Sequence, residues 1–155
     1  MQVQFYLPPP SAEASDSVEP STVAAAQRLA QIQRVCQLCA SLYRQSLKVF
    51  VYCANQQDAE LVDEVLWQFD AHSFVPHNLA GEGPARGAPV EISWSAPRTQ
   101  RQVLINLTET VPDFVQRFSQ IIEFVPAAEQ GKAAARQKFK HYRQLGVEPQ
   151  TRTPE

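Results

Sequence analysis

Residues 48–53, Lys-Val-Phe-Val-Tyr-Cys, form a nearly continuous apolar run. Such a run lacks the alternation of a strand with one wet face, so it is typical of a parallel strand covered on both faces. A helical pattern follows it, and strand-like and helix-like segments then alternate along the chain. This alternation predicts an α/β fold, a single three-layer domain over residues 1–155 with a mostly parallel, twisted sheet.

The first third of the chain begins with a predicted strand at residues 3–7. A Pro-rich loop at residues 8–20 follows, and we expect it to be mobile. Ser21 or Thr22 can cap a long helix at residues 23–44. The apolar positions of this helix recur at steps of three and four, which indicates one buried face. They are Ala25, Leu29, Ile32, Cys36, Cys39 and Tyr43.

The remaining predicted elements follow the same pattern of strands and helices. Helices are expected at residues 57–69, 113–117 and 128–145, and strands at residues 89–94, 102–107 and 121–125. The last helix is basic and should end near Gly146, because glycine is a common helix stop. The tail at residues 150–155 has no helical pattern and is predicted to be flexible.

The composition fits one soluble globular domain. With 155 residues, 44% of them hydrophobic, the chain can bury a sizeable core. The N-terminus has no basic segment followed by a long apolar one, so no secretory signal is expected. No 18 apolar residues run together, so no membrane partner is expected and a cytoplasmic location follows by default.

Charge is distributed unevenly along the chain. The net charge is −2, from 14 basic and 16 acidic residues. Six of the basic residues but only two of the acidic ones lie in residues 131–155. A basic end on an acidic body indicates that an acidic partner or a nucleic acid docks at that end.

The Gly- and Pro-rich stretch from Ser73 to Ile92 contains no complete phosphate-binding pattern. Neither Gly81 nor Gly83 leads to the Lys-Ser/Thr pair of a phosphate-binding loop. A dinucleotide fingerprint also fails, because prolines interrupt the helix that it requires. A nucleotide-dependent enzyme of similar fold is therefore disfavoured.

The cysteines and histidines do not form a recognisable reactive site. Cys36 and Cys39 have CxxC spacing, but they lie in mid-helix on the buried face, so core packing is the better interpretation. The three histidines, His72, His77 and His141, are not at metal-ligand spacing. His77 has no nucleophile pattern beside it, and a structural hydrogen bond is its expected role. We therefore expect no catalytic residue, no metal and no cofactor.

The last predicted helix carries a row of cations. Lys132, Arg136, Lys140 and Arg143 are separated by four, four and three residues, so they share one face. This row is either solvated surface or part of a binding site. Phe139 lies beside it in the sequence, and Val125 and Tyr142 are expected nearby. Cations around an apolar pocket suit a ligand with a negative charge and an apolar anchor, such as a protein C-terminus that ends in an aromatic residue.

Four segments together resemble the chi subunit family of the bacterial DNA polymerase III holoenzyme, and the resemblance covers nearly the whole chain. Ser73 to Ile92 is the most specific of them. The others are Phe5-Tyr6-Leu7, Val62-Asp63-Glu64-Val65-Leu66-Trp67 and Phe124-Val125-Pro126. The resemblance implies a Rossmann-like fold without a nucleotide site, in a non-catalytic accessory subunit of the replicative polymerase.

The resemblance also implies two partners. One is the acidic, Phe-terminated C-terminal tail of single-stranded-DNA-binding protein, which would bring indirect contact with single-stranded DNA. The other is the psi subunit, which joins chi to the clamp-loader complex. By motif position, the tail would be held by Lys132, Arg136, Lys140, Phe139, Val125, Gly146 and Thr151. Phe74 matches the aromatic on the psi side.

The chain departs from the family pattern in three places, and a rival function remains. Phe139 stands where the family often has Tyr, the Pro-rich segment after Leu7 is longer than expected, and the tail after Gly146 differs. The rival is direct binding of single-stranded nucleic acid through the basic helix. Few aromatics for base stacking and an acidic body argue against that rival.

Overall fold

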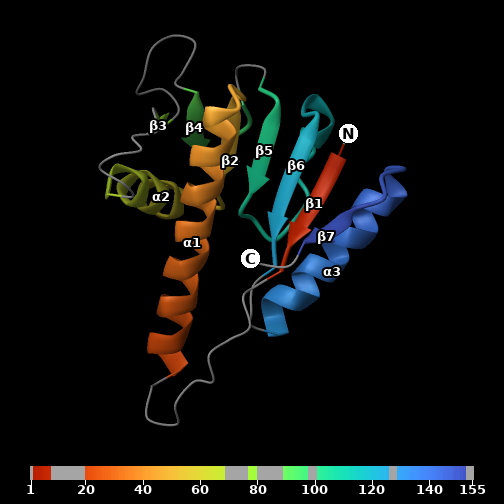
Figure 1. Ribbon diagram of the computed structural model, residues 1–155. Coiled ribbons are helices and arrows are strands. Elements are labelled where there is room, and N and C mark those ends of the chain that lie inside the picture. The colour runs from red at the N-terminus through yellow and green to blue at the C-terminus, as the bar shows by residue number, and fades with distance from the viewer. Residues whose placement is uncertain are drawn as a thin grey trace.

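The computed structural model of the chain describes residues 2–7, 20–68, 77–79, 89–97, 101–125 and 129–152. In these ranges the chain forms strands, α-helices and one 3-10 helix, labelled in Figure 1. The elements are β1 (Gln2–Tyr6), α1 (Pro20–Arg44), β2 (Val49–Tyr52), α2 (Gln56–Gln68), β3 (His77–Leu79), β4 (Val90–Ser93), β5 (Val103–Asn106), η1 (Val115–Arg117), β6 (Gln120–Phe124), α3 (Glu129–Gln144) and β7 (Gln150–Arg152).

The strands form one seven-stranded sheet in the order β3-β4-β2-β5-β6-β1-β7. Every neighbouring pair in this sheet is parallel. The strand predicted from residues 48–53 is β2, and it lies in the middle of the sheet, where Val49, Phe50 and Val51 are all buried. The predicted α/β fold with a parallel sheet is therefore confirmed.

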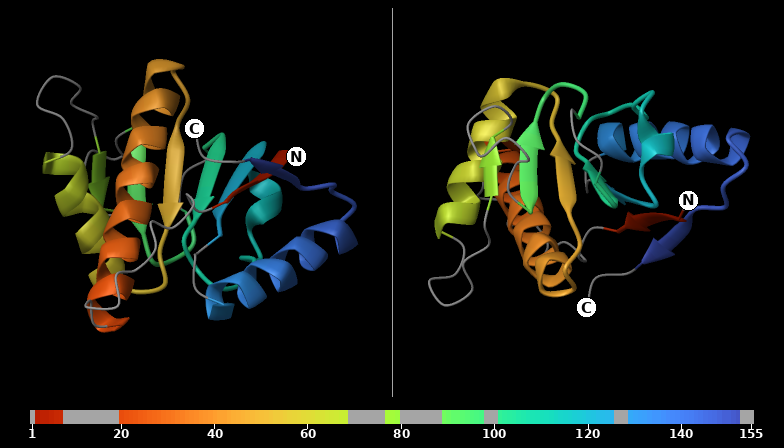
Figure 2. Two further views of the ribbon diagram at one scale, coloured as in Figure 1. Left: turned by 60° about the horizontal axis from the view of Figure 1, so that its bottom comes forward. Right: turned by 90° about the horizontal axis from the view of Figure 1, so that it is seen from above.

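Helices cover both faces of the sheet and enclose two hydrophobic cores (Figures 1 and 2). On one face, α1 and α2 pack against inward-facing residues of the central strands, such as Val51 and Ile105. On the other face, α3 and the 3-10 helix pack against Phe5, Phe50 and Leu104. Alternate residues of one strand, such as Phe50 and Val51, enter different cores because strand side chains point to alternate faces.

Two edge strands differ from the sequence prediction. β7 occupies residues 150–152, inside the predicted flexible tail, and pairs in parallel with β1. All three of its side chains are exposed, so no apolar alternation marked it in the sequence. β3 lies in the Gly- and Pro-rich stretch from Ser73 to Ile92, where no strand was predicted before residue 89. The predicted Pro-rich loop lies, for residues 8–19, outside the described residues.

The C-terminal ends of α1 and α3 use the same hydrogen-bonded turn. After α3, the amides of Gly146 and Val147 donate to the carbonyls of Arg143 and Tyr142, at 3.0 and 3.1 Å. These bonds form a Schellman motif, which requires a left-handed residue, and Gly146 has φ +87°. After α1, Ser46 takes the same position with φ 63°. The prediction that Gly146 ends the last helix is confirmed.

The cysteines belong to the core. Cys36, Cys39 and Cys53 are fully buried among the residues beneath α1 and α2. Burial raises the pKa of Cys36 to about 12, so its thiol stays protonated at neutral pH. This confirms the core-packing interpretation. Within the described part of the chain, no helix combines the length and the apolar character needed to cross a membrane.

Candidate functional site

Helix α3 has a buried face and an exposed face. Ala135, Lys138 and Tyr142 are buried, and their spacing of three and four residues places them on the side of the helix that meets the sheet. Arg136 and Lys140 lie between these positions in the sequence and are exposed. Because of the 3.6-residue period, Lys138 lies on the buried side of the helix and Lys140 on its exposed side.

The buried face of α3 is joined to the sheet through the carboxylate of Glu123 in β6. This side chain is completely buried. The Lys138 ammonium donates to one of its oxygens at 2.7 Å. The Tyr142 hydroxyl and the Asn106 amide donate to the other oxygen, at 2.6 and 2.8 Å. Three donors from β5 and α3 thus surround one acceptor from β6 and fix the helix on the sheet.

Burial raises the pKa of both acidic groups in this network. For Glu123, loss of solvation raises the pKa by more than Lys138 and the hydrogen bonds from Tyr142 and Asn106 lower it. Burial and the neighbouring carboxylate raise the pKa of Tyr142, so its hydroxyl remains a donor across the physiological range. Removing the Glu123 carboxylate would leave the Lys138 ammonium without this anionic partner and the Tyr142 hydroxyl without this acceptor.

The network also holds the loop that follows β5. Lys138 donates a second hydrogen bond to the Thr108 carbonyl at 3.0 Å. The Asn106 amide donates to the Thr110 carbonyl at 2.9 Å, and its oxygen accepts from the Thr108 amide and hydroxyl, at 3.1 and 2.6 Å. The loop 107–110 is therefore fixed by side chains that belong to the core.

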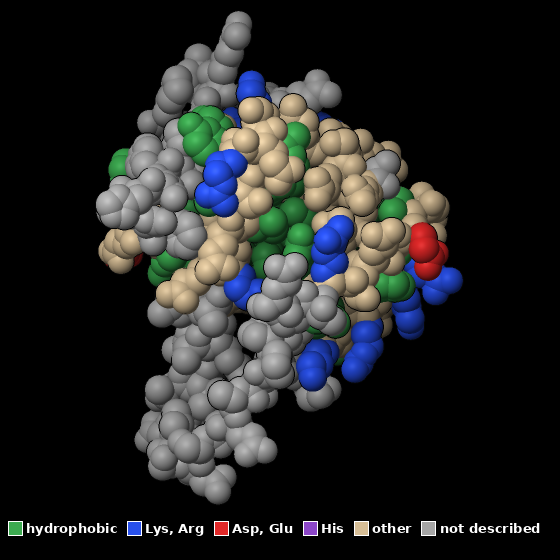
Figure 3. All heavy atoms as spheres, in the orientation of Figure 1, with side chains coloured by type: hydrophobic (Ala, Val, Ile, Leu, Met, Phe, Trp, Pro, Cys, Tyr) green, Lys and Arg blue, Asp and Glu red, His purple; other side chains and the backbone are tan. Residues whose placement is uncertain are grey.

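The exposed face of α3 carries the cations predicted from the sequence. Arg136 and Lys140 are exposed and Lys132 is half-buried. Figure 3 shows Lys and Arg side chains gathered over the region where α3 lies in Figure 1. Arg143 lies 3.9 Å from Glu148, but both side chains are well exposed, so this ion pair contributes little to stability.

An apolar surface lies next to these cations. Phe139 is half-buried, and its ring centroid is 5.4 Å from that of Phe5 in β1. Val125 and Val147 are also partly buried and pack against the same core as Phe139. Thr151 in β7 pairs in register with Phe5 and is exposed. The helix, the end of β6 and the edge of the sheet thus contribute to one partly apolar region.

The structure places the predicted site residues as follows. Phe139, Val125 and Thr151 are all associated with Phe5 or its core, and Gly146 forms the turn that links α3 to β7. Phe74 lies outside the described residues. Half-buried aromatic and aliphatic groups beside exposed cations can bind a carboxylate that carries an apolar side chain.

Lys138 is a residue of this region for which no position was predicted. It is one of the six basic residues at 131–155 but lies outside the predicted row of cations, and the structure buries it against Glu123. Its position, three residues after Ala135 and four before Tyr142, is in phase with the buried face. That phase was the available signal, but a buried lysine requires a carboxylate from another element, which local sequence does not reveal.

The fold and this site define a doubly wound α/β protein whose last helix presents a basic, partly apolar surface. The family described as DNA polymerase III chi subunit, HolC, matches residues 1–150. The chain therefore belongs to the DNA polymerase III chi subunit family, and the resemblance found in the sequence is confirmed.

Three relatives named DNA polymerase III subunit chi illustrate the similarity. The protein of Escherichia coli is 42% identical over 123 residues, which cover 78% of this chain and 84% of the relative. The protein of Haemophilus influenzae is 44% identical over 113 residues, covering 72% of this chain and 78% of the relative. The protein of Pseudomonas aeruginosa is 35% identical over 146 residues, covering 94% and 91%.

Proposed function

We propose that this chain is a non-catalytic accessory subunit of the DNA polymerase III holoenzyme. In this role it links the clamp-loader complex, through psi, to single-stranded-DNA-binding protein. Membership in the chi family supports assembly with the polymerase, since the relatives are named as its subunits. The observation that carries the tail-binding part is the arrangement of exposed Arg136 and Lys140 beside half-buried Phe139.

The proposed ligand is the acidic C-terminal tail of single-stranded-DNA-binding protein, which ends in Phe. Its terminal ring would pack against Phe139 and Val125, while Lys132, Arg136 and Lys140 attract its carboxylates. Burial of a Phe side chain contributes roughly 1.5–3 kcal/mol. Each exposed ion pair contributes about 0–1 kcal/mol, and ordering a flexible peptide costs several kcal/mol. Well-formed charge-assisted hydrogen bonds to the peptide's carboxylates contribute about 1.5–3 kcal/mol each. We therefore expect weak binding, micromolar at best, on the order of −8 kcal/mol.

The test is a fluorescence-anisotropy titration with an acidic peptide that ends in Phe. Deleting the terminal Phe should remove most of the affinity, because both the ring and the correctly placed α-carboxylate are lost. Rising salt should weaken binding, since the Debye length falls below roughly 8 Å above physiological ionic strength. Equal binding in high salt, or without the Phe, would refute this mechanism.

A labelled single-stranded oligonucleotide serves as the second ligand in the same titration. Tail binding predicts that the oligonucleotide binds much more weakly than the peptide. Lys48→Ala is a matched control, because Lys48 is exposed and precedes β2 rather than lying on α3. Tighter binding to the oligonucleotide that Arg136→Ala weakens would favour the rival function.

The psi side of the proposal rests on Phe74, which matches the family's psi-side aromatic. Phe74→Ala should abolish association with a psi subunit and leave tail binding unchanged. A pull-down with psi and the peptide titration measure the two effects separately. Loss of both activities together with a lower melting temperature would show instead that Phe74 supports the core.

A further inference from the structure

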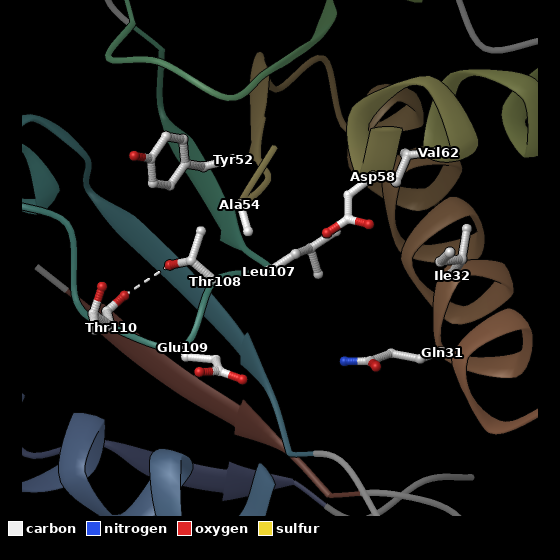
Figure 4. Close-up of a pocket in the computed structure, with 10 residues that line it drawn as sticks. All are labelled: Gln31, Ile32, Tyr52, Ala54, Asp58, Val62, Leu107, Thr108, Glu109 and Thr110. Atoms are coloured by element: carbon white, nitrogen blue, oxygen red, sulfur yellow. Dashed lines mark hydrogen bonds between the residues drawn. The ribbon is translucent and has the colours of Figure 1, made fainter. Parts of the chain in front are cut away.

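A cavity of about 520 Å³ lies beyond the ends of β2 and β5, on the side of the sheet covered by α1 and α2 (Figure 4). Its volume falls in the range of pockets that bind small organic groups. The described residues that line it are Gln31, Ile32, Tyr52, Ala54, Asp58, Val62, Leu107, Thr108, Glu109 and Thr110. None of these belongs to the surface proposed for tail binding.

The cavity lies where the segments that follow two neighbouring strands leave on opposite faces of the sheet. β2 and β5 are neighbours, but the chain leaves β2 towards α2 on one face and leaves β5 towards the 3-10 helix on the other. Divergent connections open a crevice outside the carboxyl ends of the two strands, where doubly wound proteins bind ligands. The cavity is therefore a product of the fold.

The walls of the cavity are fixed before any ligand arrives. The loop 107–110 is held by Asn106 and by Lys138, as described above. On the opposite wall, the Asn55 side chain accepts a hydrogen bond from the Asp58 amide at 2.9 Å and caps α2. A preformed site binds with less ordering cost than a flexible one.

The described lining of the cavity is acidic, which is unfavourable for the phosphate groups that doubly wound folds often bind in this crevice. Asp58 and Glu109 line it from α2 and from the loop after β5, and its described lining contains no Lys or Arg. A phosphate at the first turn of α2 would meet the Asp58 carboxylate there and the Glu109 carboxylate on the loop after β5, and the Asn55 side chain already caps the helix. The charges of the described lining therefore favour a cation over a nucleotide phosphate.

The remaining lining residues indicate what kind of cation fits. Ile32, Val62 and Leu107 give the cavity an apolar wall, while Gln31 and Thr108 offer hydrogen-bonding groups. Figure 4 shows the Asp58 and Glu109 carboxylates on different elements around the same space. Among the described residues, no group of three or more His, Cys, Asp and Glu residues is arranged to hold a metal ion. The lining suits an organic cation on an aliphatic stem.

We propose that this cavity binds an alkyl guanidinium or ammonium group of about the size of an arginine or lysine side chain. The stem packs against Ile32, Val62 and Leu107, and the charged end lies between Asp58 and Glu109. Such a group can belong to a free amine or to a basic side chain of a protein partner. The proposal does not depend on tail binding, because the two sites share no lining residue.

The test is an NMR titration of the full chain with butylguanidine, which reproduces an arginine side chain. Saturable shifts should centre on Ala54, Leu107 and Thr108. Butylurea, an uncharged analogue of the same shape, should bind at least about tenfold more weakly, because it lacks the charge that the carboxylates attract. Binding of butylguanidine weaker than about 1 mM, or equal binding of butylurea, overturns the proposal.

Variants locate the site on the two carboxylates. Asp58→Asn combined with Glu109→Gln should weaken butylguanidine binding at least about tenfold. Glu64→Gln, at an exposed position of α2 outside the cavity, should leave it unchanged. Two controls show whether the double variant is folded. Its NMR spectrum should keep the dispersion of the unmodified protein, and, if tail binding holds, the variant should still bind the Phe-terminated peptide. Unchanged butylguanidine binding in a folded double variant refutes the assignment.

A blocked tripeptide with a central Arg distinguishes the two sources of the cation. Affinity equal to or above that of butylguanidine assigns the site to a basic side chain of a partner protein. Affinity at least about tenfold lower assigns it to a free amine or guanidine, because the peptide backbone then obstructs entry. Both results support a cation site, and failure of both probes to bind overturns it.

Discussion

The two faces of α3 place chemically similar residues in opposite physical situations. Lys138 is 6% exposed and donates to a carboxylate that water cannot reach, whereas Lys140, two residues later, is exposed. Two residues correspond to about 200° around a helix. Lys138 therefore faces the sheet, whereas Lys140 faces the solvent. Residue type alone therefore does not distinguish a structural cation from a binding one.

The difference also predicts different consequences of mutation. On the buried face, each polar group is bonded to another buried polar group. Loss of one group therefore leaves its partner away from water with one interaction fewer, and this destabilises the folded state. On the exposed face, water replaces any lost contact, and stability should hardly change. Mutations of the buried face should change folding, and mutations of the exposed face should change only binding.

The largest effect is expected for Glu123→Ala. Removal of the carboxylate leaves the Lys138 ammonium buried without its anion, and such a loss typically costs about 3–5 kcal/mol. Urea unfolding monitored by circular dichroism measures the change in the free energy of unfolding. Glu64→Ala, at an exposed carboxylate on α2, is the matched control and should change stability by less than about 0.5 kcal/mol. A decrease of less than about 1 kcal/mol in the free energy of unfolding of Glu123→Ala would contradict the expected difference between the buried and exposed faces of α3.

Tyr142→Phe should have the next largest effect. It removes a hydroxyl that donates to the Glu123 carboxylate at 2.6 Å but keeps the buried ring. A hydrogen bond to a charged group contributes about 1.5–3 kcal/mol, which lowers the melting temperature by about 2–4 °C per kcal/mol in a domain of this size. Tyr43 on α1, which its spacing placed on the buried face, is instead 36% exposed. Tyr43→Phe should therefore leave the melting temperature unchanged. Equal melting temperatures for the two variants would contradict the role of the buried hydroxyl.

Gly146→Ala tests the turn that ends α3. A Cβ at this position meets no atom within 4 Å, so the cost comes from the left-handed backbone alone. We expect a loss of about 1 kcal/mol in the free energy of unfolding. Ser46→Gly in the matching turn after α1 should have the opposite sign and stabilise the chain by up to about 1 kcal/mol. Changes of the same sign at the two turns would show that factors other than backbone conformation dominate.

The smallest effect on stability is expected for Arg136→Ala and Lys140→Ala. Each should change the free energy of unfolding by less than about 0.5 kcal/mol. If the proposed tail binding holds, each should weaken the peptide up to about fivefold, because an exposed ion pair contributes about 0–1 kcal/mol. Lys138→Met is the comparator from the buried face and should destabilise the protein by several times more. Equal stability losses for Lys138→Met and Lys140→Ala would erase the distinction between the faces.

The sequence by itself determined the class of the fold and the position of most elements. The apolar run at residues 48–53 indicated a strand covered on both faces, and β2 lies in the middle of the sheet. Periods of three and four residues located the helices, because side-chain periodicity is a local property of the chain. The left-handed Gly146 was predictable for the same reason, since the helix end depends on adjacent residues.

Only the tertiary structure decided which elements are neighbours and which polar groups meet. β7 has no apolar pattern and exists because its backbone pairs with β1, an interaction that side chains do not encode. Glu123 and Lys138 are partners because β6 and α3 pack together. The cavity beside Asp58 and Glu109 likewise exists because β2 and β5 are neighbours whose connections diverge. Periodicity acts over a few residues, whereas strand order and buried pairing join segments far apart in the chain.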